Sequence, residues 1–180
     1  MIARLVALLL LTTLAACGEP PASQPPPEPG PPPELQRLID ESAITTIAAS
    51  LDDAVDRKDW PAALARFDEE IDVDFSSLGG APGRITKAGL IDNWKAALTP
   101  DKQSFHISSD GVATISGDTA TLMTHGYAWN RLTTRTRNDL WEVWGVYQYK
   151  FARTPQGWKI NALKFVKTYE RGDPEVRSAQ

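Results

Sequence analysis

Apolar residues recur at helical spacing over the first part of the chain that could build a core. Between residues 34 and 57 this set comprises Leu35, Leu38, Ile39, Ile44, Ile47, Ala48, Leu51, Ala54 and Val55. The spacing predicts one long amphipathic helix over 34–57. Asp59, Trp60 and Pro61 then have the order of an N-cap and a first helical turn, so we expect a short second helix that ends near Phe67.

The rest of the chain changes from helical to alternating patterns. Residues 71–75 alternate apolar and polar side chains, as a strand does, and Thr86 can cap a third helix. Beyond Asp101, runs rich in β-branched and aromatic residues are separated by turn sequences, and these runs cover 105–109, 112–116, 119–132, 140–151 and 158–168. Three helices followed by successive strands predict an α+β fold with the helices packed on one face of an antiparallel sheet.

The N-terminal residues have the layout of a secretory signal peptide. A short basic start and an apolar stretch lead to Leu14-Ala15-Ala16-Cys17, which resembles a bacterial lipobox. We therefore expect residues 1–16 to be removed and Cys17 to carry a diacylglyceryl group. The alternative is an ordinary secreted protein with a free thiol. A spanning helix is disfavoured because the apolar run is about ten residues, against the roughly 20 that a bilayer requires.

Domain boundaries follow from the composition after the signal. Residues 17–33 are dominated by proline and predict a semi-rigid spacer. One domain is expected over 34–172, followed by a C-terminal tail at 173–180. Because Gly18 rather than aspartate follows the cysteine, the sequence resembles lipoproteins sent to the outer membrane. We expect a lipid-anchored protein of the cell envelope that faces the periplasm.

Charge and residue counts narrow the set of partners. The chain has 19 Lys and Arg residues against 23 Asp and Glu residues, for a formal net charge of −4. This balance argues against nucleic acid, which requires a basic face. It also means that membrane attachment is expected through the lipid on Cys17. The chain has one cysteine and two histidines, so a disulfide within the chain and a cysteine zinc site are excluded.

Several short motifs follow one another in an order similar to that of a known family. They are Asp56-Arg57-Lys58-Asp59-Trp60, Leu64, Phe67, Asp72-Val73-Asp74-Phe75, Phe105-His106, Gly117-Asp118-Thr119-Ala120 and Gly157-Trp158-Lys159-Ile160. Together they resemble the SnoaL-like branch of the nuclear transport factor 2-like superfamily, over about residues 38–172. The resemblance implies a cone-shaped, barrel-like fold with a strongly bent sheet, an apolar cavity, and no cofactor or metal. Members include ketosteroid isomerase, scytalone dehydratase and non-enzymes, so the fold supplies a pocket rather than a reaction.

The resemblance also points to residues for the chemistry. Asp56 matches a pocket aspartate of scytalone dehydratase, and His106 matches the first of its two catalytic histidines. A carboxylate beside an imidazole can transfer protons near neutral pH. The alternatives are a solvent-facing acid and a core histidine. Asn130 stands where that enzyme has its second histidine, and Val55 where it has a tyrosine. Asparagine cannot transfer protons at these pH values, so Asn130 is expected to orient a substrate carbonyl or hydroxyl.

Aromatic residues suggest a pocket wall and an interface. Trp94 is our candidate for the cavity mouth, and Tyr147 belongs to an aromatic-rich strand that could line a site for a hydrophobic ligand; the alternative is ordinary core packing. His125 alternates with Tyr127 and Trp129, so the three share one face of a strand. This superfamily uses the outer sheet face for subunit pairing, which implies a homodimer or homotrimer.

The sequence leaves three functions open. The first is a lyase or isomerase that applies Asp/His acid–base chemistry to a small hydrophobic molecule. The second is a non-catalytic ligand-binding module displayed at the membrane. The third is a protein-interaction module of the cell envelope.

Overall fold

A curved sheet of six strands organises the computed structural model, which describes residues 30–133 and 138–178. The strands are β1 (Phe67–Asp74), β2 (Gly83–Thr86), β3 (Lys102–Ser116), β4 (Thr119–Thr133), β5 (Asn138–Thr154) and β6 (Gly157–Gly172). Their order is β2-β1-β6-β5-β4-β3. Strands β1 and β6 pair in parallel, and every other pair is antiparallel. The α+β class is as predicted, but the sheet is mixed, because β6 enters between β5 and β1 in the direction of β1.

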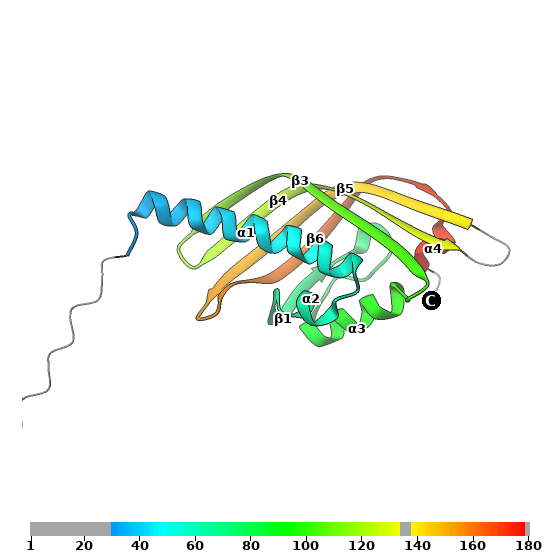
Figure 1. Cartoon of the computed structure of the whole chain (residues 1–180), viewed down its shortest axis with the longest axis horizontal. Coiled ribbons are helices and arrows are strands. Elements are labelled where there is room, and N and C mark those ends of the chain that lie inside the picture. Colours follow the sequence, from blue (N-terminus) through cyan, green and yellow to red (C-terminus); the bar gives the residue numbers. More distant parts are fainter. Residues whose placement is uncertain (1–29, 134–137, 179–180) are drawn as a thin grey trace, which may run out of the picture. The chain divides into compact units, whose positions relative to one another are not determined.

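Helices gather on one face of this sheet. They are α1 (Pro33–Asp56), α2 (Trp60–Leu64) and α3 (Lys87–Ala97), with the short helix η1 (Ser76–Leu78) and α4 (Pro174–Ser178) near the later strands. Figure 1 shows α1 lying along the sheet, with its first turns extending past it, and α2 and α3 close to β1. Helix α1 packs against β3, while α3 contacts α2, β1 and β2. Helices α1, α2 and α3 precede the long strands β3 to β6, and α4 follows them as a further α-helix that the sequence did not predict.

Two predicted helix starts carry the expected caps. The side chain of Asp59 accepts a hydrogen bond from the backbone N–H of Ala62 over 3.1 Å, and Thr86 does the same for Gly89 over 3.1 Å. Each bond satisfies one of the N–H groups that have no partner inside the helix. Helix α2 ends at Leu64, earlier than predicted, because strand β1 already begins at Phe67.

Two other differences come from turn-like sequences that lie inside strands. Residues 109–111 predicted a turn between two strands, but β3 is continuous from Lys102 to Ser116. The register shifts between Ser109 and Val112, where Asp110 has a φ of 56°. The turn residues therefore form a β-bulge instead of ending the strand. Residues 83–86, expected to belong to a loop and a cap, form the edge strand β2.

The segment predicted as a tail is part of the domain. Helix α4 buries Val176 against an apolar cluster made of Ala128, Trp141, Val143 and Phe165. Lys102 is buried beneath it, and its Nζ donates to the carbonyl oxygens of Ala97 (2.6 Å) and Arg177 (3.3 Å). Burial, with a further contribution from Lys58, lowers the pKa of Lys102. These bonds fasten α4 to the end of α3.

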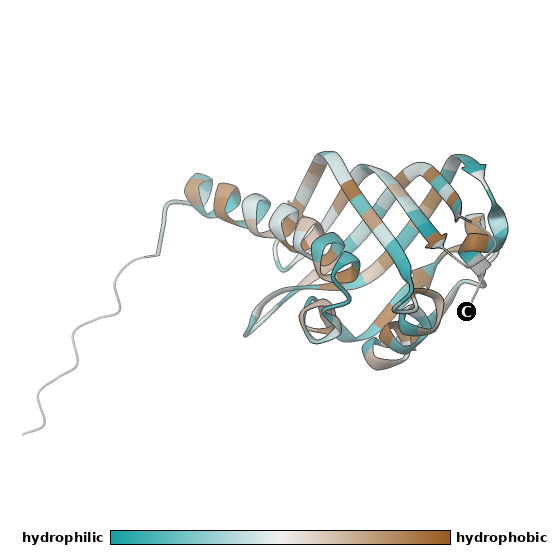
Figure 2. Ribbon diagram, turned by 45° about the vertical axis from the view of Figure 1, so that its right-hand side comes forward, coloured by the Kyte–Doolittle hydropathy of each residue, from teal (hydrophilic) through white to brown (hydrophobic). Residues whose placement is uncertain are grey.

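Strand alternation divides the sheet into an inner and an outer face. Even-numbered residues of β4 from Ala120 to Asn130 are buried, and the odd-numbered ones between them are more exposed. Figure 2 shows hydrophobic and hydrophilic positions alternating along several strands. The inner positions and the helices share one main core, whose fully buried members include Ile44, Phe67, Ile71, Ile91 and Ile160. Burying a side chain of this size contributes about 1.5–3 kcal/mol.

Three predictions fall mostly outside the described residues: the signal peptide (1–16), the lipid on Cys17 and nearly all of the spacer (17–33). Within the part that the structure describes, no helix combines the length and the apolar character that crossing a bilayer requires.

Candidate functional site

A cavity of about 700 Å³ opens between the helices and the inner face of the sheet. Its walls come from α1, α3, α4, the η1 region and all six strands, and they are mostly apolar. The apolar lining includes Leu51, Val55, Phe75, Leu90, Trp94, Leu98, Val143, Leu163 and Phe165. This volume falls within the range of small-molecule sites, about 300–1,000 Å³. The apolar cavity implied by the family resemblance is therefore present.

Asp56 and His106 are in contact at the wall of this cavity. Nδ1 of His106 lies 2.6 Å from Oδ1 of Asp56, and the backbone N–H of His106 donates to Oδ2 over 2.7 Å. The side chain of His106 is 17% exposed and that of Asp56 is 16% exposed. His106 lines the cavity, whereas Asp56 is not among the lining residues and lies behind the ring. The carboxylate favours the tautomer with hydrogen on Nδ1, which leaves Nε2 able to accept a proton.

The end of α1 positions this pair. Asp56 is the last residue of the helix, and Lys58 reverses the chain with a φ of 55°. Nζ of Lys58 donates to the carbonyl oxygen of Lys102 over 2.7 Å, where β3 begins. The helix end is thereby tied to the strand that carries His106, which keeps the two side chains in register.

A second carboxylate lies one helical turn before the first, and our sequence analysis did not assign it a role. Asp52 is 9% exposed and lines the cavity. Its Oδ2 accepts a hydrogen bond from the hydroxyl of Ser108 over 2.7 Å. Burial raises the pKa of the Asp52 carboxyl, and the bond from Ser108 only partly opposes this effect. The sequence spacing could have indicated both residues. Asp52 precedes Asp56 by four residues and so shares its helix face, and Ser108 follows His106 by two and so shares its strand face.

Asn130 lines the cavity from β4, and its amide oxygen is unpaired. The side chain is 7% exposed, and Oδ1 has no hydrogen-bond partner. Its register partner on β3, Ser104, likewise has a buried hydroxyl oxygen without a partner. Val55, which stands where scytalone dehydratase has a tyrosine, is buried and apolar at the same cavity. An unpaired buried amide is costly, so it is a natural place for a ligand to bind.

Tyr147 and Trp94 both line the cavity. The ring of Tyr147 lies across Gly126, where a Cβ atom would be only 2.4 Å from the ring. Glycine at this place therefore allows Tyr147 to lie flat against β4. Burial raises the pKa of the Tyr147 hydroxyl, so it remains protonated at neutral pH. Trp94 packs edge-on against Phe67, with ring centroids 5.8 Å apart.

His125 lies on the other face of the sheet. Its side chain is 74% exposed, and Nδ1 is 3.9 Å from a carboxylate oxygen of Asp110. Tyr127 and Trp129 follow it on that face, each against an aromatic ring of a neighbouring strand. The predicted shared face of these three residues is present, and it is remote from the cavity.

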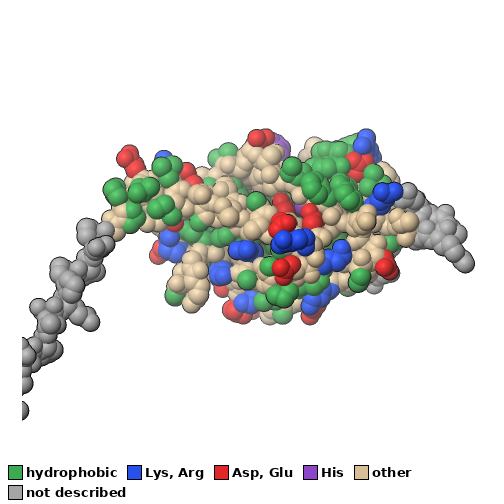
Figure 3. Space-filling model, in the orientation of Figure 1, with side chains coloured by type: hydrophobic (Ala, Val, Ile, Leu, Met, Phe, Trp, Pro, Cys, Tyr) green, Lys and Arg blue, Asp and Glu red, His purple; other side chains and the backbone are tan. Residues whose placement is uncertain are grey.

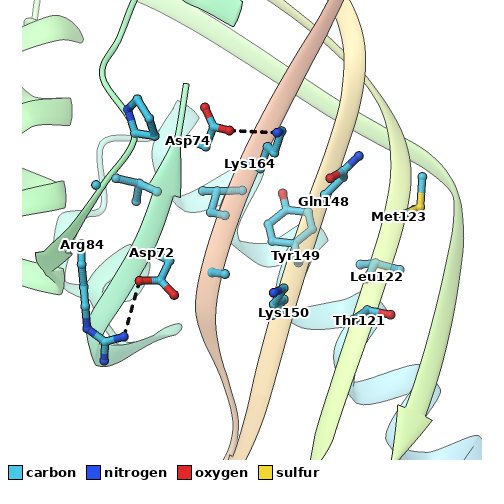
Figure 4. A pocket seen from close by; sticks show the side chains of 15 residues that line it. Asp72, Asp74, Arg84, Thr121, Leu122, Met123, Gln148, Tyr149, Lys150 and Lys164 are labelled. Carbon is cyan, nitrogen blue, oxygen red and sulfur yellow. Dashed lines mark hydrogen bonds and ion pairs between the residues drawn. The ribbon is translucent and has the colours of Figure 1, made fainter. Parts of the chain in front are cut away.

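A larger hollow, of about 830 Å³, lies on the outer face over β1, β6, β5 and β4. Figure 4 shows its charged side chains, several of which are already paired. Asp74 and Lys164 are 2.9 Å apart, and Asp72 and Arg84 are 3.4 Å apart. The inner cavity, by contrast, holds the imidazole, the buried carboxylate and the unpaired amide. We therefore place the candidate site in the inner cavity.

The groups in the inner cavity can exchange protons with a bound molecule and hydrogen-bond to it. The imidazole of His106 is oriented by Asp56, and Asp52 and Asn130 supply further polar atoms in an apolar surrounding. In the described part of the chain, no three His, Cys, Asp or Glu side chains come together in a way that could hold a metal ion.

The fold and the site together define a helix-covered, curved-sheet protein with an Asp–His pair at the wall of an internal cavity. The sequence profile of the SnoaL-like domain matches residues 36–164, and the chain belongs to this family. No curated protein sequence matches it.

Solved structures show the same fold. A protein from Kribbella flavida superposes with a TM-score of 0.74 at 23% identity, covering 79% of this chain and 99% of the other. The hexachlorocyclohexane dehydrochlorinase LinA-type3 from Novosphingobium barchaimii gives 0.64 at 16% identity, covering 78% and 94%. A candidate scytalone dehydratase from Novosphingobium aromaticivorans gives 0.67 at 15% identity, covering 77% and 90%. At these identities the likeness concerns the fold.

Proposed function

We propose that this protein is a cofactor-independent lyase or isomerase that acts on a small hydrophobic molecule in the inner cavity. The observation that carries the proposal is the 2.6 Å contact between His106 and Asp56, with the ring at the cavity wall. A partly buried imidazole held by a carboxylate is a suitable general base.

The chemistry would begin with proton abstraction from carbon. Nε2 of His106 takes a proton from a carbon next to a carbonyl group, and Asp56 stabilises the imidazolium that forms. Nδ2 of Asn130 donates to the carbonyl oxygen, where negative charge develops. The imidazolium then returns the proton to another carbon of the substrate. Alternatively, the electron pair expels a leaving group from the adjacent carbon, and the imidazolium gives its proton to that leaving group or to water. The first outcome is an isomerisation, and the second is an elimination.

Two solved relatives support the elimination branch. One is named as a dehydrochlorinase and one as a candidate dehydratase, and both names describe the loss of a small molecule from a substrate. The first test addresses proton abstraction, the step that isomerisation and elimination share.

Hydrogen–deuterium exchange into β-tetralone tests proton abstraction directly. This cyclic aromatic ketone fits an apolar cavity, and exchange next to its carbonyl can be followed by proton NMR in D2O. We expect the protein to accelerate exchange, with His106→Gln reducing the acceleration about 100-fold or more. Asp56→Asn should also reduce it, whereas His125→Gln, on the exposed outer face, should not. Equal exchange with and without protein would contradict the proposal.

A non-catalytic ligand-binding module is the second candidate. Asn130 and Val55 favour it, because neither can transfer a proton where scytalone dehydratase has a histidine and a tyrosine. This candidate predicts saturable binding of β-tetralone without accelerated exchange.

We further propose that the protein is anchored to the outer membrane through a lipid on Cys17 and faces the periplasm. The motif Leu14-Ala15-Ala16-Cys17 and the spacer that follows support this location. Mass spectrometry of the mature N-terminus should detect the diacylglyceryl adduct. A Cys17→Ser variant should leave the membrane fraction, and an unmodified thiol in the wild type would contradict the anchor.

The outer sheet face is our proposed contact with a second copy, in a homodimer or homotrimer. Figure 3 shows hydrophobic side chains gathered at the upper right of the view. Exposed large apolar residues of this face include Phe105, Ile107, Met123 and Tyr169, which are 42–57% exposed. Apolar groups gathered in this way are typical of interaction sites. Light scattering should give a multiple of the monomer mass, and Ile107→Glu should reduce it. A wild-type monomer at high concentration would contradict this proposal.

A further inference from the structure

The inner cavity contains a polar position that the proposed mechanism does not use. Asp52 accepts one hydrogen bond, from Ser108 to Oδ2, and it lines the cavity. Its other oxygen, Oδ1, has no hydrogen-bond partner among residues 30–133 and 138–178. A carboxylate that is largely buried with a single donor is incompletely solvated, and this costs free energy unless a partner is supplied.

The surroundings of Asp52 do not supply that partner. The titratable and polar groups that face it are Asp56 on α1, His106 and Ser108 on β3, and Tyr147 and Tyr149 on β5. Of these, only Ser108 donates to it. Asp56 is itself an acid and raises the pKa of Asp52 further, and His106 is engaged by Asp56. The Asp52 carboxyl therefore receives a single hydrogen bond, from Ser108, and none from the described residues on the cavity side.

Asn130 provides an independent sign that the cavity is built for a polar occupant. Its side chain is more than nine-tenths buried and belongs to the same cavity wall, and its amide oxygen is unpaired. Ser104, His106 and Ser108 alternate along the inner face of β3, and successive members of such a row are about 7 Å apart. Asn130 is the register partner of Ser104, while Asp52 bonds to Ser108. The His106 ring thus stands between two hydrogen-bonding positions.

We propose that Asp52, oriented by Ser108, is a ligand-binding residue whose free oxygen accepts a hydrogen bond from the occupant of the cavity. The occupant is therefore a hydrophobic molecule that carries a hydroxyl or an ammonium group, and not a plain hydrocarbon. The inference rests on the proposed function only in taking the inner cavity as the binding site. It does not depend on the chemistry of His106.

Three naphthalene derivatives test this inference. They carry an ethyl, a hydroxymethyl or an aminomethyl group at the same ring position, so they differ in one terminal group and match closely in size. Binding is measured by equilibrium dialysis at neutral pH, where the amine is protonated. We expect the wild-type protein to bind at least one donor-bearing probe about tenfold or more tightly than the ethyl probe. Which of the two is preferred identifies the donor as hydroxyl or ammonium.

Variants of Asp52 locate the preference. Asp52→Leu should abolish the preference for the donor-bearing probes and still bind the ethyl probe. Asp52→Asn should lose the preference for the aminomethyl probe and keep part of the preference for the hydroxymethyl probe. Asp53→Asn is the matched control, because Asp53 lies on the same helix in an exposed pair with Arg57. Circular dichroism confirms folding, and Ser108→Ala serves as a milder variant if Asp52→Leu does not fold.

The possible failures are distinguishable. Equal binding of all three probes, or a preference that survives in folded Asp52→Leu, would overturn this inference and leave the proposed function standing. Absence of binding by every probe would overturn both. Exchange into β-tetralone with no donor preference would support the enzyme and refute the role of Asp52.

Discussion

Helix α1 buries two aspartates about three turns apart, and their surroundings are opposite. Asp40 accepts hydrogen bonds from both terminal nitrogens of Arg153, over 2.9 and 2.6 Å, from Nε1 of Trp158 over 2.9 Å, and from Gln36 over 3.2 Å. The guanidinium of Arg153 also lies over the ring of Trp158, 4.2 Å from its centroid. Asp52 has Ser108 alone.

The two carboxyls consequently shift their pKa in opposite directions. The hydrogen bond from Arg153 lowers the pKa of Asp40 to about 2, and this effect outweighs burial. Burial raises the pKa of Asp52, because its single donor does not compensate for lost water. The comparison shows that this helix supplies full hydrogen bonding where a carboxylate joins elements together. At the cavity, by contrast, the Asp52 carboxylate has a single hydrogen-bond donor, as is typical of a functional group that also binds a ligand.

Removing the charge at Asp40 should have the largest effect on stability. Asp40→Asn removes the buried ionic partner of Arg153, which keeps only its pair with the exposed Asp118, and it weakens the link between α1 and the β5–β6 hairpin. We expect a loss of about 3 kcal/mol in the free energy of unfolding, measured by urea denaturation at pH 7. The exposed substitution Asp53→Asn should change it by less than about 0.5 kcal/mol.

The loss at Asp40 should depend on pH in a defined direction. Because the pKa of Asp40 is lowered in the folded state, its stabilisation is present above the unfolded pKa of about 3.9 and disappears as the pH falls towards 2. Wild type and Asp40→Asn should therefore converge at low pH. A constant difference down to pH 2 would contradict the ionic role.

Removing the charge at Asp52 should act in the opposite direction. Asp52→Asn relieves a buried charge while its amide oxygen can still accept from Ser108. We expect a gain of about 1 kcal/mol in the free energy of unfolding at pH 7. Because the folded pKa of Asp52 is raised, the native-state penalty is absent below about pH 3.9 and grows as the pH rises through the folded pKa. The gain should vanish in acid, and a loss at pH 7 would contradict the comparison.

Ser108→Ala should have the smallest effect. It removes the single donor to Asp52, and we expect a loss of about 0.5–1 kcal/mol at pH 7 with a further rise in the pKa of the carboxyl. Ser109→Ala is the control, because Ser109 is exposed on the other face of the same strand. Equal effects of the two substitutions would show that the bond to Asp52 contributes nothing.

Local patterns predicted most of the elements of this fold. Helical periodicity located α1, the caps at Asp59 and Thr86 located α2 and α3, and alternation located the long strands. Pairings between distant segments were not predictable from such patterns. The parallel pairing of β1 with β6, the bulge at Asp110 and the packing of α4 over Lys102 all depend on contacts made only in the folded chain.

The site residues likewise include some that the sequence pointed to and some that only the folded structure brought together. The family resemblance singled out Asp56 and His106, and the structure brings these two side chains into contact. Asp52 and Ser108 were not singled out, although they share a helix face and a strand face with that pair. Sequence spacing places Asp52 on the helix face of Asp56 and Ser108 on the strand face of His106. Only the packing of α1 against β3 brings the Ser108 hydroxyl to the Asp52 carboxylate.

The comparison can be tested most directly by a pH titration of the aspartate side-chain carboxyls, followed by ¹³C NMR with Asp40→Asn and Asp52→Asn for assignment. We expect Asp40 to stay ionised down to about pH 2 and Asp52 to take up its proton above the ordinary aspartate range. Adding the aminomethyl naphthalene probe at neutral pH should perturb the Asp52 signal and leave that of Asp40 unchanged. An Asp52 carboxyl that titrates at or below the ordinary value would contradict the account.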